Sequence, residues 1–177
     1  MVADSMDAMT ITDFEKQQRG PYLFDWWLGK TQVPTPLGLF SVEFQILDDG
    51  DTNPPDDEML WRAVELKTYA ERHGDYLLDI VFAYYLLAAE DDPDWLEFCK
   101  VPHGLTRDNI AEYVREDRSL VVSRHLDWDE AYSSAIHIVP LWDEEHALSL
   151  AFRGGAIAAA NDSLFKLEAG IFRWIED

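Results

Sequence analysis

The chain has 177 residues, and its 35 Asp and Glu against 14 Lys and Arg give a formal net charge of −21 at pH 7. This charge argues against direct binding to nucleic acids and to anionic membranes, because both interfaces draw their affinity from Lys and Arg. The aromatic content of 13% is too high for a solvated acidic tail, so the charge belongs to a folded domain.

The N-terminal residues 1–20 show no sustained hydrophobic periodicity. They predict a flexible arm, followed by a single domain over residues 21–177. The arm has no early Lys or Arg and no continuous apolar core, so it does not resemble a secretory signal. Cys99 is the only cysteine and excludes an intramolecular disulfide. We therefore expect a cytoplasmic protein that does not enter a membrane.

The next segment predicts a β-hairpin. Residues 22–28 are rich in aromatic side chains, prolines and Gly38 interrupt the chain, and residues 39–47 alternate between apolar and polar. The apolar positions of this second strand share one face: Phe40, Val42, Phe44 and Ile46. An acidic loop with two prolines over residues 48–55 then marks the end of the hairpin.

Two long helices are expected after this loop. The first begins near Asp56 and ends at His73-Gly74, where glycine suits a left-handed helix terminus. Asp75 can cap the second, over residues 76–89, which has almost no polar face and should be the core helix.

Shorter helical segments follow. Asp92-Pro93 predicts a short helix, since proline is tolerated at the first helical position, and we expect its apolar residues to pack inward. These residues are Trp95, Leu96 and Phe98. Thr106 is a candidate cap for another helix, through Ile110 and Val114.

From residue 119 the apolar period changes to two. Residues 120–126, 135–142, 147–152 and 156–160 predict consecutive strands, and Gly154-Gly155 predicts a tight turn. Residues 163–175 fit helix and strand equally well. The order of elements predicts an α+β fold, in which an antiparallel sheet (N-terminal hairpin plus C-terminal meander) packs against two or three central helices.

No motif for a nucleotide, a cofactor or a catalytic triad is present, and we expect no cofactor, no metal and no catalysis. One enzymatic alternative stays open. A metal-dependent hydrolase could use residues of the C-terminal strands, namely His125, His137, Asp143 and His146.

The most distinctive string, Trp-Asp-Glu-Glu-His-Ala over residues 142–147, lies between two predicted strands. It resembles the W-D-x-E-H-G element in the C-terminal hairpin of a group of bacterial domains of unknown function, with Ala147 in place of the glycine. The resemblance implies a structural role for Trp142, Asp143, Glu145 and His146. It also implies similarity to acidic immunity-type proteins that occur beside polymorphic toxins.

Charge without catalytic motifs favours a binding protein, in particular an immunity-type inhibitor that occludes a basic toxin or effector such as a nuclease. A regulatory or structural subunit of a bacterial assembly or defence system is the alternative. Trp26 and Trp27 are the expected aromatic anchors. The expected acidic contacts are Asp48, Asp49, Asp51, Asp56, Asp57 and Glu58 in one cluster, and Glu90, Asp91, Asp92 and Asp94 in another.

Overall fold

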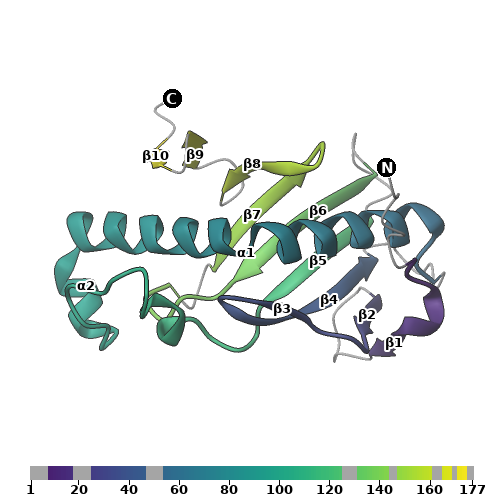
Figure 1. Ribbon diagram of the computed structural model, residues 1–177, viewed down its shortest axis with the longest axis horizontal. Coiled ribbons are helices and arrows are strands. Elements are labelled where there is room, and N and C mark those ends of the chain that lie inside the picture. Colours follow the sequence, from purple (N-terminus) through teal and green to yellow (C-terminus); the bar gives the residue numbers. More distant parts are fainter. Residues whose placement is uncertain are drawn as a thin grey trace.

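The computed structural model describes residues 8–17, 25–46, 54–124, 131–143, 147–160, 165–168 and 171–174 (Figure 1). The first half of the chain contains β1 (Phe14–Gln17), β2 (Asp25–Gly29), β3 (Val33–Thr35), β4 (Gly38–Ile46), α1 (Asp57–Asp91) and α2 (Pro93–Phe98). The second half contains β5 (Ser119–Arg124), β6 (Tyr132–Ile138), β7 (Leu148–Arg153), β8 (Ala156–Ala160), β9 (Phe165–Glu168) and β10 (Ile171–Trp174).

The strands form one sheet in the order β1-β2-β4-β5-β6-β7-β8-β9-β10, with β3 also paired to β4. Neighbours are antiparallel except β4 and β5, which run parallel because α1 and α2 cross over between them. The predicted α+β class, the N-terminal hairpin and the C-terminal meander are confirmed. Residues 165–168 and 171–174 settle as strands, and Gly154 and Gly155 form the β7–β8 turn with φ of 59° and 82°.

The described part of the expected N-terminal arm contains a strand. β1 lies within residues 1–20 and pairs with β2 at the edge of the sheet. Phe14 is buried there and packs against Phe44, with ring centroids 4.3 Å apart. An aromatic side chain that reaches the core therefore fixes a segment whose hydrophobic pattern is too short to predict a strand.

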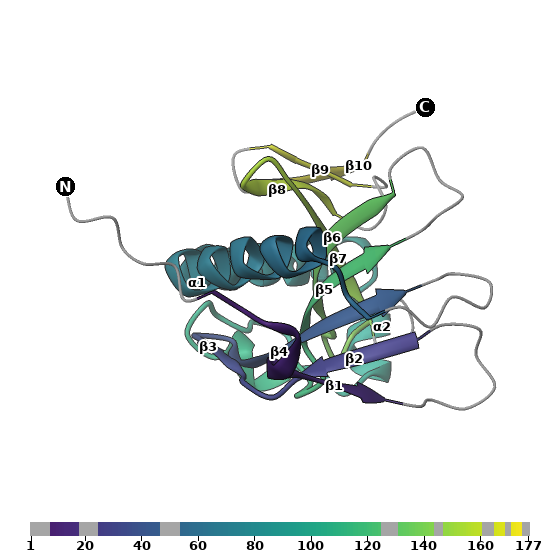
Figure 2. The ribbon, with the colours of Figure 1, turned by 90° about the vertical axis from the view of Figure 1, so that its right-hand side faces the viewer.

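The core lies between one face of the sheet and α1, which runs across that face (Figures 1 and 2). All four predicted apolar positions of β4, from Phe40 to Ile46, are fully buried. The two predicted long helices are joined into α1, which is bent at His73, where φ is −119° and ψ is 23°. The sequence thus located the interruption between the two helical segments, which the structure has as a kink at a non-helical residue.

Gly74 has a different role from the one expected. A Cβ atom on Gly74 would lie 2.6 Å from Cδ of Pro36, in the turn between β3 and β4. Glycine is therefore needed because this turn comes so close to the helix, and a left-handed backbone is not involved.

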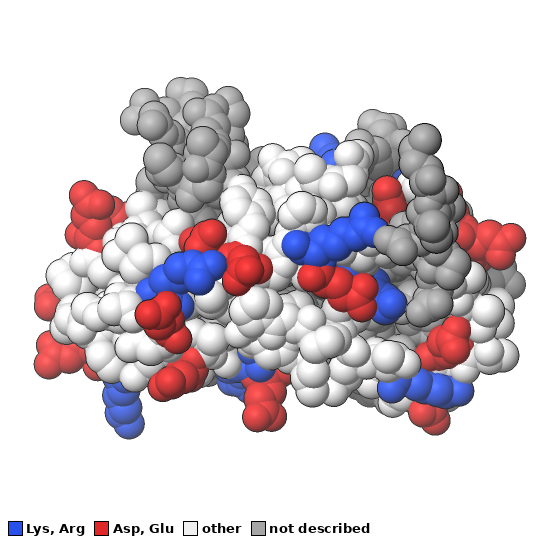
Figure 3. All heavy atoms as spheres, viewed as in Figure 1, with Lys and Arg blue, Asp and Glu red and all other residues white. Residues whose placement is uncertain are grey.

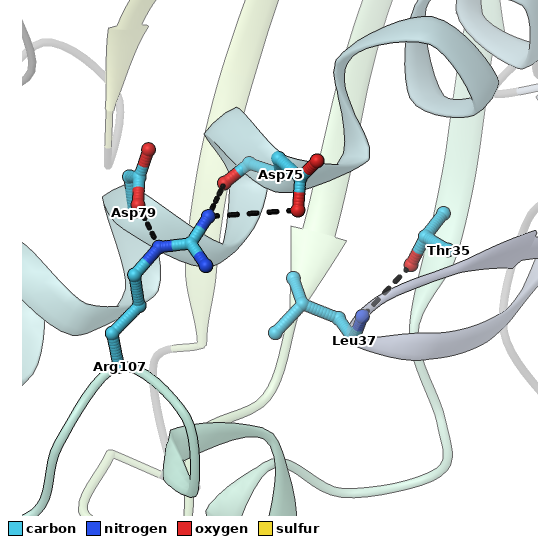
Figure 4. A network of polar contacts seen from close by, with 5 residues as sticks. All are labelled: Thr35, Leu37, Asp75, Asp79 and Arg107. Carbon is cyan, nitrogen blue, oxygen red and sulfur yellow. Dashed lines mark hydrogen bonds and ion pairs between the residues drawn. The ribbon is translucent and has the colours of Figure 1, made fainter.

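Asp75 does not cap a second helix. Arg107, in the segment between α2 and β5, donates to the backbone oxygen of Asp75 at 3.2 Å and pairs with its carboxylate at 3.5 Å. The same guanidinium hydrogen-bonds the carboxylate of Asp79. Figure 4 shows Arg107 between the two aspartates, with Leu37 and its hydrogen bond to Thr35 in the adjacent turn. These exposed contacts tie the segment to the middle of α1.

Gly74→Ala should destabilise the protein, although alanine normally stabilises a helix relative to glycine by about 0.5–1 kcal/mol. The new methyl group meets the rigid ring of Pro36, and such overpacking costs about 1–3 kcal/mol. Urea unfolding of the variant measures the loss. The double variant Pro36→Ala/Gly74→Ala should recover much of it, and a single variant as stable as wild type would contradict the steric explanation.

The short helix α2 forms as predicted, with Pro93 in its first turn and the Asp92 carboxylate accepting from Trp95 N at 3.0 Å. Leu96 is buried, but the expected burial of Trp95 and Phe98 is wrong, because both are exposed. Thr106 caps no α-helix either. Its backbone N donates to Oδ1 of Asn109, ahead of a short 3-10 helix over Ile110–Tyr113.

α1 is 35 residues long, and it carries charged side chains as far as Asp79 and again at Glu90 and Asp91. Within the part of the chain that the structure describes, no helix combines the length and apolarity needed to cross a bilayer.

Candidate protein-binding site

One end of the molecule carries a small cleft, which we call the Trp95 cleft. It has a volume of about 240 Å³ and lies between the end of α1, the start of α2 and the turn that follows β6. Its lining residues are Tyr84, Leu87, Ala88, Asp91, Trp95, Trp142 and Asp143. The walls are thus mainly apolar, with two carboxylates.

Two hydrogen bonds hold the cleft together. Nε1 of Trp95 donates to the backbone oxygen of Trp142 at 2.7 Å, and the Tyr84 hydroxyl donates to Oδ2 of Asp143 at 2.5 Å. The Trp142 ring is 2% exposed and meets Tyr85 edge-to-face at 5.6 Å. The two described residues of the Trp142–His146 string therefore join the end of the sheet to both helices. Glu145 and His146 lie outside the described residues.

The rim of this cleft exposes large aromatic surface. Phe98 is 75% exposed and stacks on Trp95, which is 43% exposed, with ring centroids 5.2 Å apart. Sequence reasoning missed this, although the helical period contains the signal. In a six-residue helix that buries Leu96, the positions one before and two after it point toward another face.

Acidic residues flank these two aromatic residues in the sequence. Residues 90–98 contain five carboxylates and no Lys or Arg, and Lys100 is the first cation after them. The structure places four of the predicted contact residues here, in exposed positions: Glu90, Asp91, Asp92 and Asp94. In Figure 3 acidic side chains are visible at the end of the molecule where α1 ends and α2 begins. Asp92 also serves as the α2 cap.

The first predicted acidic cluster is not presented as one surface. Asp48, Asp49 and Asp51 lie outside the described residues. Asp57 and Glu58 are exposed in the first turn of α1, and Glu58 pairs with Arg62 at 2.8 Å. This turn is at the opposite end of α1 from the Trp95 cleft, about 50 Å away at the normal helical rise.

Asp56 has a structural role. Its Oδ1 accepts from Met59 N at 3.0 Å, and its Oδ2 accepts from Arg124 at 2.9 Å and from the Tyr132 hydroxyl at 2.7 Å. Burial acts to raise the pKa of the Asp56 carboxyl, but these hydrogen bonds and the Arg124 charge outweigh it and hold the pKa below its ordinary value. We therefore leave Asp56 out of the binding surface.

Trp26 and Trp27 are both half-buried on β2 and are not exposed anchors. Trp27 packs against the core, and Lys16 lies over its ring at 6.0 Å. Figure 1 shows β2 far from α2, so these rings do not share a surface with the second acidic cluster.

The hydrolase alternative gains no support in the described residues, among which no group of three His, Cys, Asp or Glu could hold a metal ion. His125 and His146 lie outside them. His137 is on β6, and Asp143 accepts from Tyr84. Cys99 is half-buried and packs against the core.

No family model matches this chain, and neither a curated protein nor a solved structure shows significant similarity to it. The resemblance carried by the Trp142–His146 string therefore stays a prediction.

Proposed function

We propose that this protein is an acidic binding module that takes a Lys or Arg side chain of a basic protein partner into the Trp95 cleft. The biological role we propose is that of an immunity-type inhibitor, which covers the cationic surface of a toxin or effector. The observation that carries the proposal is an apolar cleft with two carboxylates, bordered by an exposed aromatic pair.

The cleft has the chemistry that a long basic side chain requires. The aliphatic part of Lys or Arg can lie against Leu87, Ala88 and the Trp95 ring, since these side chains favour burial of their carbon stems. The charged end can then pair with Asp91 and Asp143, and the face of an indole also attracts a cation.

The aromatic rim supplies the affinity that charge alone does not. Exposed carboxylates contribute little to a complex, typically 0–1 kcal/mol per surface ion pair. Aromatic side chains that become buried dominate interface energetics, and Trp is among the commonest hot-spot residues. Phe98, stacked on Trp95, is positioned to be covered by the partner.

The net charge of −21 has a kinetic role in this proposal. A strongly negative protein attracts a cationic partner before contact and raises the association rate, an effect that salt screens. Rapid capture benefits an inhibitor that must block a toxin before it acts. A nuclease suits this role, because its cationic substrate-binding surface complements the acidic rim.

The test compares two double variants that remove the same number of negative charges, one pair beside the cleft and one pair away from it. Asp91→Asn/Asp94→Asn changes the acidic rim, whereas Glu15→Gln/Asp57→Asn changes exposed acids elsewhere. Each protein is tagged and used at low salt to capture binding partners from the source cells. Wild type and the control pair should retain one basic protein, and the rim variant and Phe98→Ser should lose it. Loss of aromatic surface also raises the dissociation rate measured with that purified partner, by about tenfold or more.

Two results would refute the proposal. In the first, the rim variant and the control pair retain the same proteins in the same amounts. In the second, the retained protein binds equally well at low and high salt, since charge steering requires a salt-dependent association rate. If the partner is a toxin, its activity measured with and without this chain separates inhibition from simple assembly into a complex.

A further inference from the structure

A second cavity lies at the other end of α1, where the sheet divides between β6 and β7. The two strands pair from Ala135↔Ala151 to Ile138↔Leu148 and then separate. Beyond that point β6 continues beside β5 as far as Tyr132, while β7 shifts register at Ala151/Phe152 and continues beside β8 to Arg153. This irregularity lies between β7 and β8, on the side of β7 away from β6.

The cavity at this division has a volume of about 680 Å³, within the range of small-molecule sites. We call it the split-sheet cavity. Its described lining contains Arg62, Arg153, His137 and four serines, and no Asp or Glu. In a chain with 35 acidic residues, this composition stands out against the rest of the surface. The nearby carboxylates already have cationic partners, because Glu58 pairs with Arg62 and Asp56 pairs with Arg124.

One lining residue has an unused polar group. Ser134 is 6% exposed, and its hydroxyl finds no hydrogen-bond partner in the structure, which holds the described residues without ligand or solvent. Burial of a hydroxyl without a partner costs about 1–3 kcal/mol, so such groups usually face a bound molecule or water. Ser134 lines the cavity, and it lies on the part of β6 that has left β7.

Two aromatic rings complete the wall. Tyr132 and Phe152 both line the cavity, one on each of the separated strands. The Tyr132 hydroxyl is held by Asp56 at 2.7 Å, and the guanidinium of Arg62 lies 5.6 Å from the centre of the Tyr132 ring. The ring is therefore fixed before any ligand arrives.

The geometry points to a binding site for a small organic anion that carries a flat ring. Its charged group, a phosphate or carboxylate, would accept from Arg62 and Arg153 and from the serine hydroxyls, all of which can donate. Its ring would lie against Tyr132 and Phe152. This site is separate from the Trp95 cleft, since Arg62 and Asp91 are about 40 Å apart along α1.

Ligand-observed NMR with the full chain can test this site with paired probes. Nucleoside monophosphates and aromatic carboxylates form one set, and the matching nucleosides and aromatic amides form the uncharged set. We expect several anionic probes to bind and their uncharged partners to bind about tenfold more weakly, as charge-assisted hydrogen bonds to Arg are lost. Binding should not depend on the protein partner proposed above.

Two variants place the binding in the cavity. Ser133 is exposed and lines it, so Ser133→Trp fills the space without altering the core, and Arg153→Gln removes a charge. Each should weaken anion binding about tenfold. Arg72→Gln, which removes an equal charge from an exposed position on α1 that does not line the cavity, should leave binding unchanged. The site is refuted if no anionic probe binds, if uncharged probes bind as well as anions, or if binding survives Ser133→Trp unchanged.

Discussion

Asp56→Ala should lower the free energy of unfolding by about 2–4 kcal/mol, combining about 1 kcal/mol for a lost helix cap with the larger loss of a partly buried charge pair. Asp56 accepts from Met59 at the start of α1 and from Arg124 and Tyr132 on neighbouring strands. Arg124 is only 8% exposed, so the Asp56 carboxylate helps to stabilise its charge. The Asp56 side chain is about one third exposed, which keeps the expected loss below that of a fully buried pair.

The same carboxylate should make stability depend on pH in the acid range. The pKa of Asp56 lies below its ordinary value of 3.8, so the folded state holds the proton less tightly than the unfolded state. Its contribution is therefore complete above the unfolded pKa and is lost as the pH falls through the folded pKa. Urea midpoints measured across this range should fall less steeply for Asp56→Asn than for wild type.

Two matched variants separate the contributions of Asp56. Asp56→Ser keeps a side chain that can cap α1 but removes the charge for Arg124, so it should recover only the smaller part of the loss. Asp57→Ala removes an adjacent exposed acid and should change stability by less than about 0.5 kcal/mol. If Asp56→Ala were no more damaging than Asp57→Ala, the network would be a surface feature without energetic consequence.

Local patterns predicted most of the individual elements. The alternation from Phe40 to Ile46 gave the buried face of β4, and Asp92-Pro93 gave the start of α2. These predictions succeed because residue spacing and capping chemistry act within a few residues of the chain. The kink at His73 was located for the same reason, whereas the close approach of Pro36 to Gly74 joins segments far apart in sequence.

Long-range contacts explain what the sequence did not predict. The sequence predicted an antiparallel sheet, but β4 and β5 pair in parallel, because the long helical crossover between them returns the chain in the same direction. The candidate site depends on a similar long-range contact. The Trp95 indole donates to Trp142, 47 residues away, so neither sequence segment alone indicates a cleft. Charge clustering in the sequence did locate the acidic residues beside this cleft, whereas Trp26 and Trp27, the predicted aromatic anchors, are half-buried on β2.

Trp142→Ala should lower the free energy of unfolding by about 3–5 kcal/mol, the usual cost of truncating a large buried aromatic side chain. The ring is 2% exposed and packs against Tyr85 and Tyr84, at 5.6 Å and 6.3 Å between centroids. Thermal or urea unfolding measures the loss. Asp143→Asn should cost less, because it weakens one hydrogen bond from Tyr84 and leaves the ring in place.

Trp142→Phe distinguishes a role of the Trp142 ring in core packing from direct contact of that ring with the partner. Phenylalanine keeps most of the aromatic contact and removes a buried indole N–H that has no hydrogen-bond partner within the described residues. Its stability loss should therefore be well below that of Trp142→Ala. The backbone oxygen that accepts from Trp95 is unchanged, so the Trp95 cleft should persist and partner capture should continue. A phenylalanine variant that is stable yet captures no partner would instead place Trp142 among the residues that contact the partner directly.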